Sequence, residues 1–124
     1  NTWFMDGAGN ISVTAPKNFT VNAGENITMT AGKNVTVSAG DDMDNSAGKN
    51  ITQTAGNDLS QSAMGNITEM SNNRTEMVEK DFIRQADTSN EIASEVTIFS
   101  QKENMTLQSG KTVEVNSAEK SKMF

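Results

Sequence analysis

Ala23-Gly24-Glu25-Asn26-Ile27-Thr28-Met29-Thr30 is one of eight consecutive octads that divide the chain, without insertion, from Gly7 to Met70. The first octad position is Ala in seven octads, and the second is Gly in five. The fourth is always Asn or Asp, and the fifth is always large and apolar. A fixed short period is the signature of a repeat architecture, in which each unit buries its apolar residues against neighbouring units.

The columns of the octad predict its local structure. Ala-Gly-x-Asn is typical of a turn, because Gly adopts positive φ freely and Asn hydrogen-bonds to nearby backbone. The Ile-Thr-x-Thr that follows alternates apolar and polar side chains, which is typical of a half-buried strand. Each octad therefore predicts a short strand and a tight corner. The predicted corner residues are Gly24, Gly32, Gly40, Gly48, Gly56, Asn26, Asn34, Asn50 and Asn66.

The composition predicts that several chains complete one core. Only 34% of the 124 residues are hydrophobic, so a monomer would bury little apolar surface to offset its chain entropy. The strict period argues against disorder, and a chain without Cys has no disulfides to replace a core. One octad is too short to close a coil with three faces, whereas three chains around one axis would each supply one wall. We therefore predict an all-β fold, an elongated, intertwined homotrimeric triple-stranded β-helix that forms an octad-repeat needle.

The predicted trimer core comprises the fifth position of all eight octads and the seventh position of the first four octads. Its members are Ile11, Phe19, Ile27, Val35, Met43, Ile51, Leu59, Ile67, Val13, Val21, Met29 and Val37. After Val37 the seventh position becomes polar, from Asn45 to Glu69. If this position points inward, the axis turns polar along the repeat, and if it lies at the wall, the change has little effect. The pattern leaves both open.

The octads dissolve after Met70. Residues 71–95 are irregular and charged, and they fit either a short helix over Met77–Ala86 or continued strand with a degenerate repeat. The lack of strong helix caps favours continued strand. Short alternating strands return after residue 95, and Ser109–Asn116 reproduces the octad in a frame shifted by six residues, which predicts a bulge or loop between the blocks. The predicted parts are a lead-in at 1–6, regular β-helix at 7–70, the charged segment at 71–95, and a distal β segment with a C-terminal cap at 96–124.

Charge and residue usage argue against several function classes. The net charge of −6 argues against a nucleic-acid partner, which selects a basic surface. The absence of His removes the commonest general base and metal ligand, and no pattern builds a cleft, so we predict no enzyme and no cofactor. Asp41, Asp42 and Asp44 would form a carboxylate ring in a trimer, a candidate ion site. However, Asp42 holds the usual Asn position and Asp44 an outward one, which favours a solvated belt and no metal.

The octads resemble the C-terminal triple-stranded β-helix of VgrG, the spike protein of type VI secretion systems, and are similar to the needle of phage contractile-tail central spikes. Residues 1–10 look like the lead-in from the oligonucleotide-binding-fold part of VgrG proteins. The chain begins at Asn1 without an initiator Met, and we expect it to be a fragment of a longer protein. The resemblance covers residues 1–70, and other trimeric fibres use similar octads.

The resemblance implies a structural, membrane-puncturing needle that transmits force in a contractile injection machine. It implies a PAAR-type tip protein or effector at the C-terminal end, where Lys122, Met123 and Phe124 are candidate docking residues. It also implies a tube protein as partner through the missing upstream part, and a target membrane contacted transiently. The spike would assemble in the bacterial cytoplasm and then be expelled to the extracellular space or a target cell. Metal-bearing tips of this family use His, which this chain lacks.

An alternative from another class is a monomeric β-solenoid with two octads per coil. Its Thr-x-Thr rows, such as Thr28 with Thr30, would form a flat surface-binding face of the ice-binding or adhesin kind. The rows decay toward Thr68 and Met70, and no disulfide or evident core would stiffen such a coil.

Overall fold

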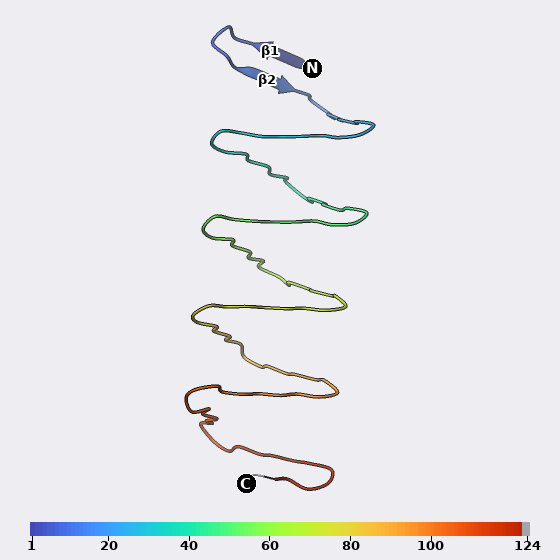
Figure 1. Ribbon diagram of the computed structural model, residues 1–124. Helices are drawn as coiled ribbons and strands as arrows, with labels where there is room; N and C mark the ends of the chain where they lie inside the picture. The colour runs from blue at the N-terminus through green and yellow to red at the C-terminus, as the bar shows by residue number, and fades with distance from the viewer. Residues whose placement is uncertain (123–124) are drawn as a thin grey trace. The chain divides into compact units, whose positions relative to one another are not determined.

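The computed structural model describes residues 1–122 (Figure 1). Its regular secondary structure consists of two strands, β1 (Thr2–Met5) and β2 (Ile11–Thr14), and the described residues contain no helix. The chain divides into two units, Asn1–Asn66 and Ile67–Phe124, which are described separately. The non-helical character that the octads predict is therefore confirmed, and the small antiparallel sheet is compatible with an all-β fold. The strands predicted in the octads after Thr14 are not formed in this single chain.

Strands β1 and β2 form an antiparallel hairpin at the start of the first unit. Trp3 pairs with Val13 and Met5 with Ile11, while Thr2 pairs with Thr14. Because successive side chains alternate across a strand, the apolar pairs share one face and the threonine pair lies on the other. β2 coincides with the fifth to eighth positions of the first octad, so in this octad the alternating part is a strand as predicted.

Asp6 organises the turn of this hairpin. Its carboxylate accepts hydrogen bonds from the backbone N–H of Ala8 at 2.8 Å, the backbone N–H of Asn10 at 3.1 Å and the Asn10 side-chain amide at 2.6 Å. The Asp6 N–H donates to the Asn10 carbonyl at 3.2 Å. Gly7 and Gly9 have φ of 78° and 94°, values that L side chains rarely adopt. The Asn10 side chain, followed by the two backbone donors, holds the pKa of Asp6 below its ordinary 3.8.

We expect acid to loosen this turn. A carboxyl group whose folded-state pKa lies below its unfolded value stabilises the fold above the unfolded pKa, and the stabilisation is lost as the pH falls through the folded pKa. The hairpin should therefore stay intact down to pH 3.8 and loosen below it. NMR shifts of Thr2–Met5 and Ile11–Thr14 at falling pH measure this. Asp6→Ala should show the loosened shifts at neutral pH as well, and an acid-insensitive wild-type hairpin would contradict the assignment.

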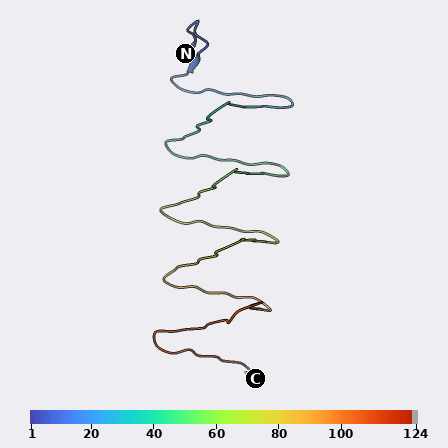
Figure 2. The same ribbon diagram turned by 60° about the vertical axis from the view of Figure 1, so that its left-hand side comes forward.

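Beyond Thr14 the first unit is a bent chain without further strands. The backbone bends at residues 16–17, 24–25, 32–33, 40–41, 48–49, 56–57 and 64–65, once in each octad. Within this unit the chain runs back and forth between its bends in wide, open turns (Figures 1 and 2). The predicted corners Gly24, Gly32, Gly40, Gly48 and Gly56 all lie at bends, whereas the predicted corner asparagines follow one residue after a bend.

The conformation of these corner glycines differs from the prediction. Positive φ occurs only at Gly7 and Gly9 among the residues that the structure describes. At Gly24 and Gly48 an added Cβ would meet nothing within 4 Å. The hairpin turn reverses the chain, whereas these bends only redirect it. They therefore need no residue with positive φ.

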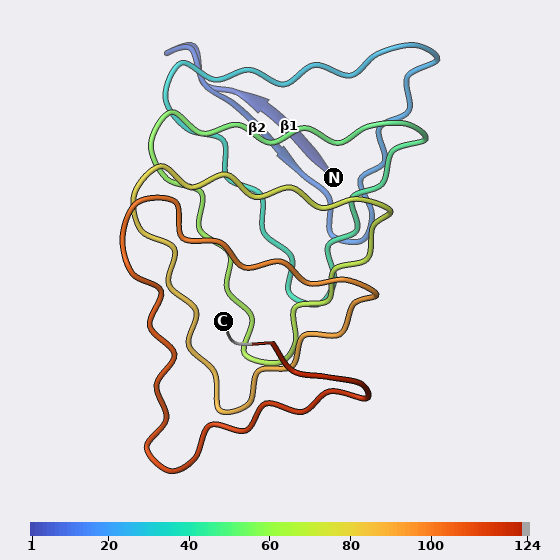
Figure 3. The same ribbon diagram turned by 60° about the horizontal axis from the view of Figure 1, so that its bottom comes forward.

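The second unit continues the pattern of bends, at residues 72, 79–80, 87, 94, 101–103, 110–111 and 118–119. Residues 77–86 contain no helix, so the helical alternative for this segment is wrong, and the chain continues with bends as in the first unit. Within this unit the chain winds in wide, open turns (Figure 3). From residue 72 to residue 110 successive bends begin seven, eight, seven, seven and nine residues apart, and the octad spacing returns from residue 110. The frame shift is therefore spread over several repeats of unequal length.

Candidate assembly face

The large apolar side chains of this chain lie in the open. None of the residues that the structure describes is buried. The twelve predicted core residues are between 44% exposed, at Val13, and 73% exposed, at Met29. One chain therefore presents these side chains to solvent and does not cover them itself.

The fifth and seventh octad positions lie on one side of the chain. Phe19 in the fifth position is 65% exposed, and Val21 in the seventh is 55% exposed. By contrast, Met64 and Met70, which occupy neither position, are 108% and 95% exposed. Residues two apart in an extended segment share a face, which agrees with this division. We call this side the assembly face, and by their spacing we assign the polar seventh-position residues that follow Val37 to it.

After Thr14, a small residue comes directly before each bend, with Val78 as the one larger exception among the described residues, and it marks the register of the assembly face. It is Ala at 15, 23, 31, 39, 47, 55, 63, 86 and 93, Ser at 71, 100, 109 and 117, and Val at 78. In the regular octads the face residues lie four and two positions before the next such residue, as Ile27 and Met29 lie before Ala31. This spacing gives a rule: the assembly-face residues of a repeat are found by counting four and two residues back from the residue that precedes the next bend.

The same rule extends the assembly face through the irregular part of the chain. It selects Val96 and Ile98 before Ser100, and these are less exposed than their neighbour Phe99, at 50% and 70% against 80%. Residues 71–77, 86–92 and 93–99 are seven-residue repeats, and 100–108 is a nine-residue repeat. Dividing the sequence into fixed octads from Gly7 does not identify these repeats, because their lengths differ from eight. The Ala or Ser that precedes most of the bends is nevertheless visible in the sequence.

Between residues 69 and 91 the assembly face is charged. The rule selects five charged residues here: Glu69, Arg74, Glu76, Arg84 and Glu91. Arg74 forms ion pairs with both Glu69 and Glu76. The Arg84 guanidinium lies 5.8 Å from the centroid of the Phe82 ring, a cation–π distance. Arg74, Glu76, Phe82 and Arg84 line one open hollow.

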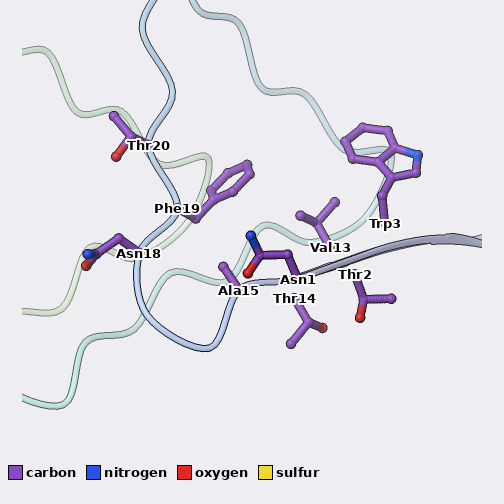
Figure 4. Close-up of a pocket in the computed structure, with 9 residues that line it drawn as sticks. All are labelled: Asn1, Thr2, Trp3, Val13, Thr14, Ala15, Asn18, Phe19 and Thr20. Carbon is purple, nitrogen blue, oxygen red and sulfur yellow. The ribbon is translucent and has the colours of Figure 1, made fainter.

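A second hollow lies beside the hairpin, and Figure 4 shows its lining. Trp3 and Val13 project to one side of the strands, while Thr2 and Thr14 project to the other (Figure 4). Phe19 also lines the hollow, together with Asn1 and Asn18. Val13 and Phe19 belong to the assembly face, so this hollow is the N-terminal beginning of that face, widened by the Trp3 indole.

The remaining predicted site residues are not brought together within one chain. Asp41 and Asp42 lie at or beside a bend, and with Asp44 they are exposed. No group of three or more acidic residues suited to a metal ion occurs within residues 1–122. Lys122 is exposed, while Met123 and Phe124, the other candidate docking residues, lie outside the described residues. A helix of the length and apolarity needed to cross a membrane is likewise not found among the residues described.

Comparisons of the chain with protein-family models, with curated proteins and with solved structures gave no match. The chemistry of the assembly face is therefore the basis for assigning a role. A row of exposed apolar side chains, repeated at every bend, is a surface suited to association with other protein. It is open and follows the chain, and it lacks the enclosed, convergent polar groups typical of a small-molecule site.

Proposed function

We propose that this chain is the needle segment of a trimeric spike, an octad β-helix whose three copies cover one another's assembly faces. The observation that carries the proposal is the exposure of the apolar face in a single chain: Ile27, Ile51 and Ile67 are each about 60% exposed. Apolar residues at fixed intervals along so much of a chain favour burial by a partner with the same period.

A second copy of the same chain has that period by construction. Parallel copies in register place bend beside bend and apolar residue beside apolar residue at every repeat. The segments after Thr14 pair with no other strand in the described residues, so their backbone groups are open to neighbouring chains. Closed three-fold symmetry leaves no free sheet edge along the shaft, which limits uncontrolled addition of further strands.

The monomeric solenoid fits these observations less well. Its coils would hydrogen-bond to one another within one chain and cover their own apolar side chains. In the structure the only paired strands among residues 1–122 are β1 and β2. The Thr28 and Thr30 row would remain outside in either architecture, so this row does not favour the solenoid.

The proposed role is mechanical. Three interlocked chains form a stiff shaft, because no copy leaves without unwinding from the other two. By its resemblance to VgrG needles, the shaft would transmit axial force during membrane puncture by a contractile injection machine assembled in the bacterial cytoplasm. Its C-terminal end would present a PAAR-type tip protein or effector, and its upstream part would join the tube. No catalytic activity is proposed for it.

The mass of the chain in solution tests the assembly directly. We expect light scattering to give about 40 kDa, three times the 13.3 kDa of one chain, across a wide range of concentration. A stable species of 13.3 kDa would refute the needle and favour the solenoid. Thermal hysteresis of ice growth, measured on the same sample, should be absent for the needle and present for an ice-binding solenoid.

A further inference from the structure

We propose that the charged part of the assembly face is an electrostatic interface, at which Arg74 and Arg84 of one copy pair with Glu69, Glu76 and Glu91 of neighbouring copies. The proposal rests on the proposed assembly and names the partner of this stretch as a second copy of the chain. It differs from the apolar contacts elsewhere on the face, because here complementary charges, and not the amount of buried apolar surface, select the partner.

The position of these residues is the first step. Arg74 and Glu76 lie four and two residues before Val78, and Phe82 and Arg84 lie likewise before Ala86. These are the places that Ile27 and Met29 occupy before Ala31 in a regular octad. An assembly that covers the isoleucines therefore covers these charges as well.

Their pairing is the second step. Arg74 contacts a carboxylate on each side, Glu69 and Glu76, although these side chains remain 56%, 53% and 42% exposed. Half of their surface is thus free for further partners. A guanidinium has five N–H donors and a carboxylate has two acceptor oxygens, so each group has capacity beyond its neighbour in the same chain.

Charge balance is the third step. Each copy supplies two arginines and three glutamates in alternating order, so parallel copies in register bring Arg74 of one copy to the level of Glu76 of the next. A charge covered without a partner strongly opposes association, whereas a covered pair with good geometry is tolerated.

Matched single substitutions provide the first test, on protein whose trimer mass has been verified. Glu76→Gln removes a carboxylate from the assembly face, and Glu79→Gln removes one from the neighbouring bend at 79–80. We expect Glu76→Gln to lower the melting midpoint of the trimer by roughly 5 °C or more, since three copies each lose a covered partner. Glu79→Gln should melt with the wild type. If Glu76→Gln also melts with the wild type while the trimer mass stands, the charged interface is wrong and the needle is not.

Mixing charge variants provides the second test. It distinguishes pairing between copies from pairing within one chain, because only pairing between copies lets one variant restore the assembly of the other. The variant Arg74→Glu/Arg84→Glu carries five acidic residues on this stretch, and Glu69→Lys/Glu76→Lys/Glu91→Lys carries five basic ones. Each alone should give single chains by light scattering, because like charges face one another. Refolded together they should form trimers of about 40 kDa, three times 13.3 kDa, in which two of the three contacts join oppositely charged copies. Assembly of each variant alone to wild-type mass and stability would overturn the proposal, and so would failure of the mixture to assemble.

Discussion

Replacing Ile27 with Asp is expected to convert the assembled protein into single chains of 13.3 kDa. Ile27 is 58% exposed in one chain and lies on the assembly face, so three introduced carboxylates would meet at one level of the axis. Removing each of them from water opposes association by on the order of several kcal/mol, and their mutual repulsion adds to this. The lost Ile contacts contribute a further ~2–3 kcal/mol per chain. Light scattering measures the result.

The matched control is Thr28→Asp, one residue further along the chain. Successive residues of an extended segment point to opposite sides, so this carboxylate should face solvent and leave the mass near three chains. Acid provides a second control, because protonation below about pH 4 neutralises the carboxylates and should restore part of the assembly of the Ile27→Asp protein. An unchanged mass for Ile27→Asp at neutral pH would show that the fifth octad position is not central.

Ile51→Cys is expected to produce disulfide-linked pairs of chains and leave a third chain unlinked. The natural chain has no Cys, so every disulfide reports the introduced residue. Three equivalent positions around one axis hold only one disulfide at a time. Complete oxidation should therefore link about two-thirds of the chains, provided that the Cα atoms lie within ~7 Å of one another. Non-reducing gel electrophoresis measures the linked fraction.

Thr52→Cys is the control for this experiment, since its side chain should face outward on the neighbouring position of the same strand. At equal dilution it should remain almost entirely unlinked. Linking of nearly all Ile51→Cys chains would indicate an even number of copies and contradict three-fold symmetry. Equal linking of the two variants would indicate random collision, with no defined assembly face.

Much of the local structure is predictable from the sequence because the repeat is short and its residues act locally. Ala31 before the bend at Gly32 is visible without coordinates, and so is the alternation of Ile11 and Val13 in β2. The conformation of the corner glycines was predicted wrongly, because a Gly-Asn pair is common to tight reversals and to gentle bends. The hairpin partner of β2 was also missed. Residues 1–6 belong to no octad, and pairing of Trp3 with Val13 depends on the Asp6 turn between them.

The sequence by itself determined the repeat, the non-helical character of the chain and the identity of the apolar columns, because each follows from the chemistry of eight neighbouring residues. Only the tertiary structure showed that the apolar side chains at the fifth and seventh positions are less exposed than Met64 and Met70, and that the frame shift is spread over seven- and nine-residue repeats. It also showed that Arg74 pairs with both Glu69 and Glu76. These facts depend on where each bend falls, and a bend is set by the backbone path of a whole repeat. A single residue type at a fixed spacing does not specify that path.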